Sequence, residues 1–82
     1  QWNDIGSWSA LYDIGEKDDN ANVIKGDVFT EKTTGTYINA CHHMVAVIGV
    51  KDLVIVDTPN VTFISSRDKA KEVKKIVYQL QK

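Results

Sequence analysis

Asp4 is the first residue of this chain whose type and setting could serve chemistry. It lies in Trp2-Asn3-Asp4-Ile5-Gly6-Ser7-Trp8, just before an expected helix. A carboxylate there, close to a glycine that lets the backbone approach, suits a hard cation or a phosphate site. The simpler interpretation is that Asp4 complements the helix dipole or caps a turn. One carboxylate cannot hold Mg²⁺ alone, so other ligands would have to come from a substrate or from another segment.

The run Cys41-His42-His43 is the second candidate, because all three side chains can ligate zinc. Neighbours on a strand point to opposite faces and the sequence offers no second cluster of ligands, so exposed histidines on a loop lip are the favoured interpretation. A Cys41–His43 dyad has no positioned third group for nucleophilic catalysis. The run Asp18-Asp19-Asn20 lacks the glycine and the closing glutamate of a calcium loop.

Nucleotide-binding loops are absent from the sequence. It contains neither Gly-x-Gly-x-x-Gly nor Gly-x-x-x-x-Gly-Lys-Ser/Thr, so nothing in it can cradle a triphosphate unaided. Trp2 and Trp8 are interpreted as core anchors, with stacking on a base or a sugar as the alternative. The single cysteine excludes an intrachain disulfide and fits a reducing cytoplasm.

The composition is that of one small globular domain, or of part of a larger one, with 82 residues of which 43% are apolar. A net charge of −1 gives no reason to expect nucleic acid or acidic lipid as a partner. Basic residues gather in 66–82, most simply as the solvated face of a helix, with a phosphate or acidic partner as the alternative. No apolar run approaches the roughly 20 residues that span a bilayer. Because the chain begins at Gln1 without a signal segment, we expect a fragment of a longer protein.

The chemistry-bearing residues depend on elements that the pattern predicts along the chain. A short helix is expected over 7–15, with Ser7 as its cap and Gly15 at its end. Its apolar face is formed at helical spacing by Trp8, Leu11 and Tyr12. Residues 16–26 are polar and turn-rich, which indicates a connector.

Residues 27–65 predict β-structure, since short β-branched and aromatic runs alternate with turn residues. The strand spacing fits a meander, a sandwich or a coiled β-solenoid. Leu53–Val56 is apolar at every position, so we expect both of its faces to be covered. Residues 66–82 predict a terminal amphipathic helix. Its apolar stripe is formed by Ala70, Val73, Ile76, Val77 and Leu80.

Four segments, in order, resemble the bacterial mannose-1-phosphate guanylyltransferases. Residues 2–8 resemble that family's W-x-D-[VI]-G-S-W motif, and residues 18–28 resemble its D-x-x-G-N-V-x-x-G-D-V stretch. Residues 53–58 resemble D-L-V-V-V-D-T, and residues 72–77 resemble D-V-K-K-I-V. The chain departs from the family at Asn60, where an aspartate is common, and in the more ornate loop at residues 40–44.

The resemblance implies a C-terminal fragment of a two-part enzyme. The expected fold is mainly β with flanking helices, a short left-handed β-helix closed by a C-terminal amphipathic helix. Residues 1–22 would end the nucleotidyltransferase domain and form the connector, 23–66 the β-helix and 67–82 the closing helix. Family members make GDP-mannose and pyrophosphate from GTP and mannose 1-phosphate with Mg²⁺. The motif's aspartate is a metal ligand there, which carries over to Asp4 alone.

The absent N-terminal domain would hold GTP and mannose 1-phosphate. The chain by itself is therefore expected to be inactive, with no complete catalytic set and no nucleotide-binding residues. We expect a cytoplasmic homo-oligomer with no nucleic acid or membrane partner. Three alternatives stay open: a β-helix module that joins subunits, part of a bifunctional mannose-6-phosphate isomerase/guanylyltransferase, and an unrelated small β domain.

Overall fold

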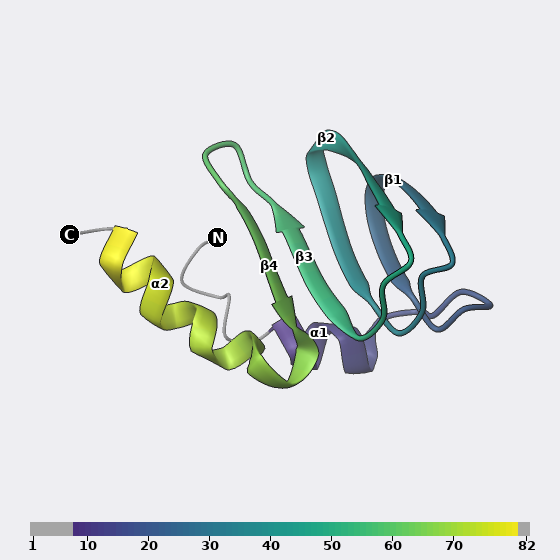
Figure 1. Cartoon of the computed structure of the whole chain (residues 1–82), viewed down its shortest axis with the longest axis horizontal. Coiled ribbons are helices and arrows are strands. Elements are labelled where there is room, and N and C mark those ends of the chain that lie inside the picture. The colour runs from purple at the N-terminus through teal and green to yellow at the C-terminus, as the bar shows by residue number, and fades with distance from the viewer. Residues whose placement is uncertain (1–7, 81–82) are drawn as a thin grey trace.

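The computed structural model describes residues 8–80, a four-stranded sheet with short helices at both ends (Figure 1). The elements follow in the order α1 (Trp8–Ile14), β1 (Val23–Glu31), β2 (Tyr37–Ile48), β3 (Leu53–Asp57), β4 (Thr62–Ser66), the 3₁₀ helix η2 (Arg67–Glu72) and α2 (Val73–Leu80). No helix in this described part is long and apolar enough to cross a membrane. The mainly β prediction is confirmed.

The strands β1, β2 and β3 lie parallel in sequence order, and β4 pairs antiparallel with β3. Val23 lies beside Tyr37, which lies beside Val54. β1 and β2 each bend over partway, so a second run of pairs joins 28–31 to 45–48 (Figure 1). Parallel pairing of consecutive strands excludes a meander for these three strands. Together with their connections, β1, β2 and β3 are called the coil.

Apolar side chains cover both faces of the sheet where β1, β2 and β3 begin. One face meets α1 and η2, and its cluster contains Trp8, Tyr12, Val23, Tyr37, Val54, Val56, Phe63 and Ala70. The other face lies inside the coil, and its cluster contains Ile38, Val47 and Ile55. Val54, Ile55 and Val56 are all at most 5% exposed. The expectation that this run is covered on both faces is confirmed.

A buried polar network stabilises the connection between β1 and β2. Asn22 is fully buried, and its Nδ2 donates to the carbonyl of Thr33 at 2.8 Å. Its Oδ1 accepts from the backbone N–H of Thr36 at 3.0 Å. Each of these buried backbone groups would cost about 1–3 kcal/mol if left unpaired. Asn22 therefore fixes where the chain turns from β1 toward β2.

The connector expected over 16–26 is wrong in its later part, because β1 already begins at Val23. The polar residues up to Asn22 do lie in a loop, whereas Lys25 is a strand residue with an exposed side chain. Asn22 is buried because its amide completes a bend formed by residues far along the chain.

The C-terminal helical segment differs from the single amphipathic helix that the pattern predicts. Residues Arg67–Glu72 form a 3₁₀ helix, and the α-helix begins only at Val73. Ala70 of the expected stripe is fully buried, whereas Ile76 and Leu80 are 55% and 53% exposed. Ile76 and Leu80 of the expected stripe are thus open to solvent.

Candidate functional site

Asp4, the expected metal ligand, lies outside the residues that the structure describes, as do Trp2 and Ser7. The helix that follows the motif is described, and it is docked on the sheet. Trp8 is 6% exposed and meets the ring of Phe63 edge-on, with centroids 5.8 Å apart. An aromatic pair of this geometry fixes the start of α1 against β4. The prediction of a core anchor is confirmed for Trp8.

Tyr12 attaches the other end of α1. Its hydroxyl donates to the carbonyl of Ala21 at 2.8 Å. Two cations lie against its ring, Lys17 Nζ at 4.6 Å and Arg67 Cζ at 4.0 Å from the centroid. Lys17 also donates to the carbonyls of Tyr12 and Asp13, where the helix dipole favours a positive charge. These contacts join α1 to the following loop and to η2.

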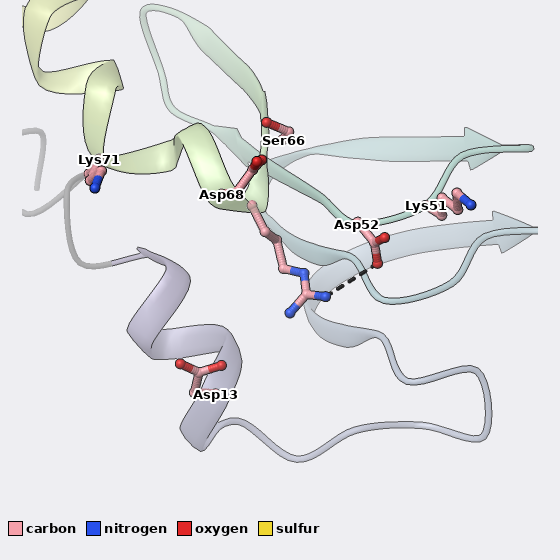
Figure 2. Close-up of a pocket in the computed structure, with 7 residues that line it drawn as sticks. Asp13, Lys51, Asp52, Ser66, Asp68 and Lys71 are labelled. Carbon is pink, nitrogen blue, oxygen red and sulfur yellow. Dashed lines mark hydrogen bonds and ion pairs between the residues drawn. The ribbon is translucent and has the colours of Figure 1, made fainter.

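A groove of about 700 Å³ runs beside α1 and η2 (Figure 2). Its lining residues are Asp13, Lys51, Asp52, Ser66, Arg67, Asp68 and Lys71. Figure 2 shows Asp13 entering from α1, Asp52 and Lys51 from the turn before β3, and Lys71 from η2. Three acidic and three basic side chains balance, so the groove carries no net charge to attract an ion.

Arg67 makes the main polar link in this groove. Its guanidinium donates to Asp52 Oδ1 at 3.2 Å, and its backbone N–H donates to the carbonyl of Asp52 at 2.8 Å. A hydrogen bond from Ser66 lowers the pKa of Asp68 below its ordinary value. The two contacts of Arg67 with Asp52 tie the start of η2 to the turn before β3.

A second cluster forms around Asp57 at the end of β3. Asp57 is 7% exposed, and its Oδ2 accepts from the backbone N–H of His43 at 3.1 Å. The ring Nδ1 of His43 lies 2.8 Å from the same oxygen, and Thr62 donates to the other oxygen at 2.9 Å. A hollow of about 550 Å³ lies between this cluster and the β3–β4 turn.

An insertion in β2 brings His43 to this place. Gly26 pairs with Ala40 and Val28 with Val45, so the single residue Asp27 faces residues 41–44. This segment bulges from the coil, and each of its side chains is exposed. His42 and His43 are exposed, as expected, but they lie in a strand and not in a loop. Sequence reasoning missed Asp57, whose one signal is an acid directly after the apolar run of β3.

Zinc chemistry at Cys41-His42-His43 gains no support. Cys41 donates its thiol proton to Asn39 Oδ1 at 2.9 Å, and the pairing of His43 is with Asp57. Across residues 8–80 no group of three or more His, Cys, Asp or Glu side chains could hold a metal ion. Within the described residues, the contacts between His43 and Asp57 attach the inserted segment 41–44 to the end of β3.

Replacing Asp57 by asparagine should destabilise the chain at neutral pH. The hydrogen bond from His43 is the largest cause that lowers the pKa of Asp57 below 3.8, while burial opposes it. A lowered folded pKa means that the stabilisation is present above about pH 3.8 and is lost as pH falls through the folded value. Thermal unfolding of Asp57→Asn should therefore occur below the wild-type temperature at pH 7, with the difference shrinking in acid.

Asp19→Asn is the matched control, since Asp19 is exposed in the loop before β1. It should leave the unfolding temperature unchanged at every pH. A difference between Asp57→Asn and wild type that stays constant down to pH 2 would refute the assigned role of the carboxylate.

Comparison with known proteins decides the family. The sequence profile of the MannoseP isomerase/GMP-like beta-helix domain matches residues 26–80. The chain belongs to this family. A chain in a crystal structure described as mannose-1-phosphate geranyltransferase from Thermus thermophilus superposes with a TM-score of 0.82 at 30% identity. That match covers 96% of this chain and 24% of the other.

Two curated relatives match nearly the whole chain. A mannose-1-phosphate guanylyltransferase of Escherichia coli is 44% identical over 79 residues, which is 96% of this chain. A putative mannose-1-phosphate guanylyltransferase of Vibrio cholerae is 41% identical over 80 residues, or 98% of this chain. The chain spans only 17% of the length of each relative.

Proposed function

We propose that this chain is the C-terminal part of a mannose-1-phosphate guanylyltransferase that forms GDP-mannose and pyrophosphate from GTP and mannose 1-phosphate. The supporting observation is the 41–44% identity to enzymes of that name across almost all of the chain. The described residues add a reason for a supporting role, because their side chains pair with one another at both clusters. The chain alone is inactive in this proposal, since the substrates bind elsewhere in the whole protein.

Mg²⁺ and Asp4 enter this proposal through the resemblance of the 2–8 motif. The described residues do not fit a metal centre of their own, because no suitable group of ligands occurs among them. Asp4 would supply one carboxylate, and the other ligands would come from outside this chain. This chain's contribution to the reaction is then the placement of that one carboxylate.

The proposed division of the chain is 1–22 as the end of the catalytic domain with its connector, 23–66 as a left-handed β-helix, and 67–82 as its closing segment, which contains η2 and α2. Parallel stacking of β1, β2 and β3 supports the coil. The fully buried Ala70 of η2, packed with the cluster beneath the sheet, supports closure at the C-terminal end.

Self-association is the second function that an observation favours. β1 is an edge strand of the sheet, and it carries Phe29, which is 54% exposed. Ile48 of the neighbouring strand β2, which pairs with Glu31, is 66% exposed. An edge strand with apolar neighbours can pair with a second copy. The proposed whole enzyme is a homo-oligomer in the cytoplasm, without nucleic acid or membrane partners. A clean monomer in sedimentation at high concentration would exclude this role.

GTP binding separates the chain from the whole enzyme. In a calorimetric titration, the full-length gene product should bind GTP saturably at micromolar concentration. The 82-residue chain should show no saturable binding. Tight binding by the chain alone, or none by the full-length product, would contradict the proposal.

A further inference from the structure

The two ends of the coil differ in how the described residues cover them. At one end β4 pairs with β3, whereas at the other end β1 pairs, within residues 8–80, with β2 alone. Ile24 lies beside Ile38, which belongs to the interior of the coil, yet Ile24 is 37% exposed. Stacked repeats need a polar outer face at their ends to stay soluble. The β1 end is therefore the one to which a further strand can be added.

The backbone of β1 presents hydrogen-bonding groups at this end. Val23 donates its N–H to the carbonyl of Thr36, which precedes β2. The carbonyl of Glu31 accepts from the N–H of Gly49, which follows β2. Because successive residues of a strand direct these groups to alternate sides, the even-numbered residues of β1 direct theirs to the open edge. Those residues are Ile24, Gly26, Val28 and Thr30.

The side chains along this edge favour a second copy of the chain as the added strand. Lys25 and Glu31 are exposed near the two ends of β1, and neither has an ion-pair partner within the part of the chain that the structure describes. Their neighbours Ile24 and Thr30 lie beside interior residues of β2, so alternation places both charges outside the coil. In the reverse direction, such a strand sets each charge against the opposite charge of a second copy.

We propose that the β1 edges of two copies pair antiparallel across a twofold axis, which gives a dimer of coils stacked end to end. β1 bends between Gly26 and Val28 (Figure 1). A bent strand can lie along a copy of itself only where the two bends coincide, so the axis passes through this part of β1. The register centred on Val28 sets Lys25 opposite Glu31 of the second copy, twice by symmetry. This inference rests on the self-association proposed above and assigns it one surface.

This register agrees with the backbone and with the apolar side chains. The even-numbered residues face one another and form the hydrogen bonds, so Lys25 and Glu31 fall at a non-hydrogen-bonded pair, where side chains lie closest. Val28 meets its own copy at the axis, and it already packs against the interior cluster of its coil. Phe29 lies diagonally across from Lys25 of the second copy, within reach of its aliphatic stem.

Charge reversal in the full-length gene product tests the pairing. Lys25→Glu and Glu31→Lys each set like charges opposite each other at both symmetric positions. Sedimentation equilibrium of either variant should give a dimer dissociation constant at least about tenfold above that of wild type.

An equal mixture of the two variants should restore the dimer. In a mixed dimer both positions again hold opposite charges, so the dissociation constant should return to within about threefold of wild type. The double variant Lys25→Glu/Glu31→Lys should behave in the same way. Because only folded subunits can restore each other, recovery also excludes misfolding as the cause of the loss. A mixture that dissociates like its components would overturn the proposed register.

Lys75→Glu and Glu72→Lys are the matched controls, since they change the same charges at exposed positions of the C-terminal helical segment. Alone or mixed, they should leave the dissociation constant of wild type unchanged. An equal loss and recovery in this control pair would show an effect of net charge and overturn the proposal.

Amide hydrogen exchange locates the surface directly. In wild type, the N–H groups of Val28 and Thr30 should exchange more slowly as the concentration rises through the dissociation constant, while those of β4 should not change. Exchange in β1 that is independent of concentration would overturn the pairing. A wild-type product that stays monomeric would remove self-association and the pairing with it. A dimeric wild type that Lys25→Glu and Glu31→Lys leave unaffected removes the pairing alone.

Discussion

Asp4→Asn should lower turnover of the full-length gene product about 10²- to 10⁴-fold while leaving folding nearly unchanged. In the proposed function Asp4 is a ligand of Mg²⁺, which stabilises developing charge by several kcal/mol, and each 1.36 kcal/mol is tenfold in rate. Asparagine keeps the shape of the side chain and removes its negative charge. The measurement is steady-state GDP-mannose formation, with a thermal melt on the same samples.

Asp19→Asn serves as the control, because it removes an equal charge from an exposed position in the same chain. Its turnover should equal that of wild type. Activity retained by Asp4→Asn would dismiss the metal role, and a large fall in its melting temperature would show that the residue is structural.

Gly26→Ala should cause a large loss of stability in the coil. Gly26 has φ +89°, a conformation that costs an L-residue about 1–2 kcal/mol. A Cβ there would also lie 2.2 Å from the carbonyl oxygen of Ala40 on the neighbouring strand. We expect a total cost of roughly 2–4 kcal/mol, or a fall in Tm of roughly 10–30 °C for a domain this small.

Gly49→Ala separates the two causes. Gly49 has φ +71°, but an added Cβ would have no atom within 4 Å, so only the backbone cost of about 1–2 kcal/mol applies. The difference in Tm between the two variants measures the close approach of β1 to β2. Equal Tm values for Gly26→Ala and Gly49→Ala would contradict the stacking of these strands at the bend.

Local properties of the sequence carried much of the fold. The apolar face of α1 could be predicted because Trp8 and Tyr12 are fixed by helical spacing, and both are buried. The continuous apolar run of β3 predicted burial on both faces, since alternation of a strand sends its side chains to opposite sides. Neither inference needs to know which segments lie side by side.

Pairings between distant residues could not be predicted in the same way. His43 meets Asp57 only because the insertion at 41–44 falls where β3 ends alongside β2. Asn22 is a polar residue in a polar stretch, and its burial depends on the backbone of Thr33 and Thr36. The terminal segment was expected as one helix, yet Arg67 is held by Tyr12 and Asp52 where the 3₁₀ turn begins. In each case the contact depends on which distant segments lie side by side, and local sequence patterns do not specify this.

The most direct test of the central claim is formation of GDP-mannose by the full-length gene product that contains this chain. With GTP, mannose 1-phosphate and Mg²⁺, we expect one pyrophosphate released for each GDP-mannose formed. Removing the 82 residues should lower that rate, because Asp4 and the sheet on which α1 packs would be lost. A folded full-length product that forms no GDP-mannose from these substrates would contradict the proposed function.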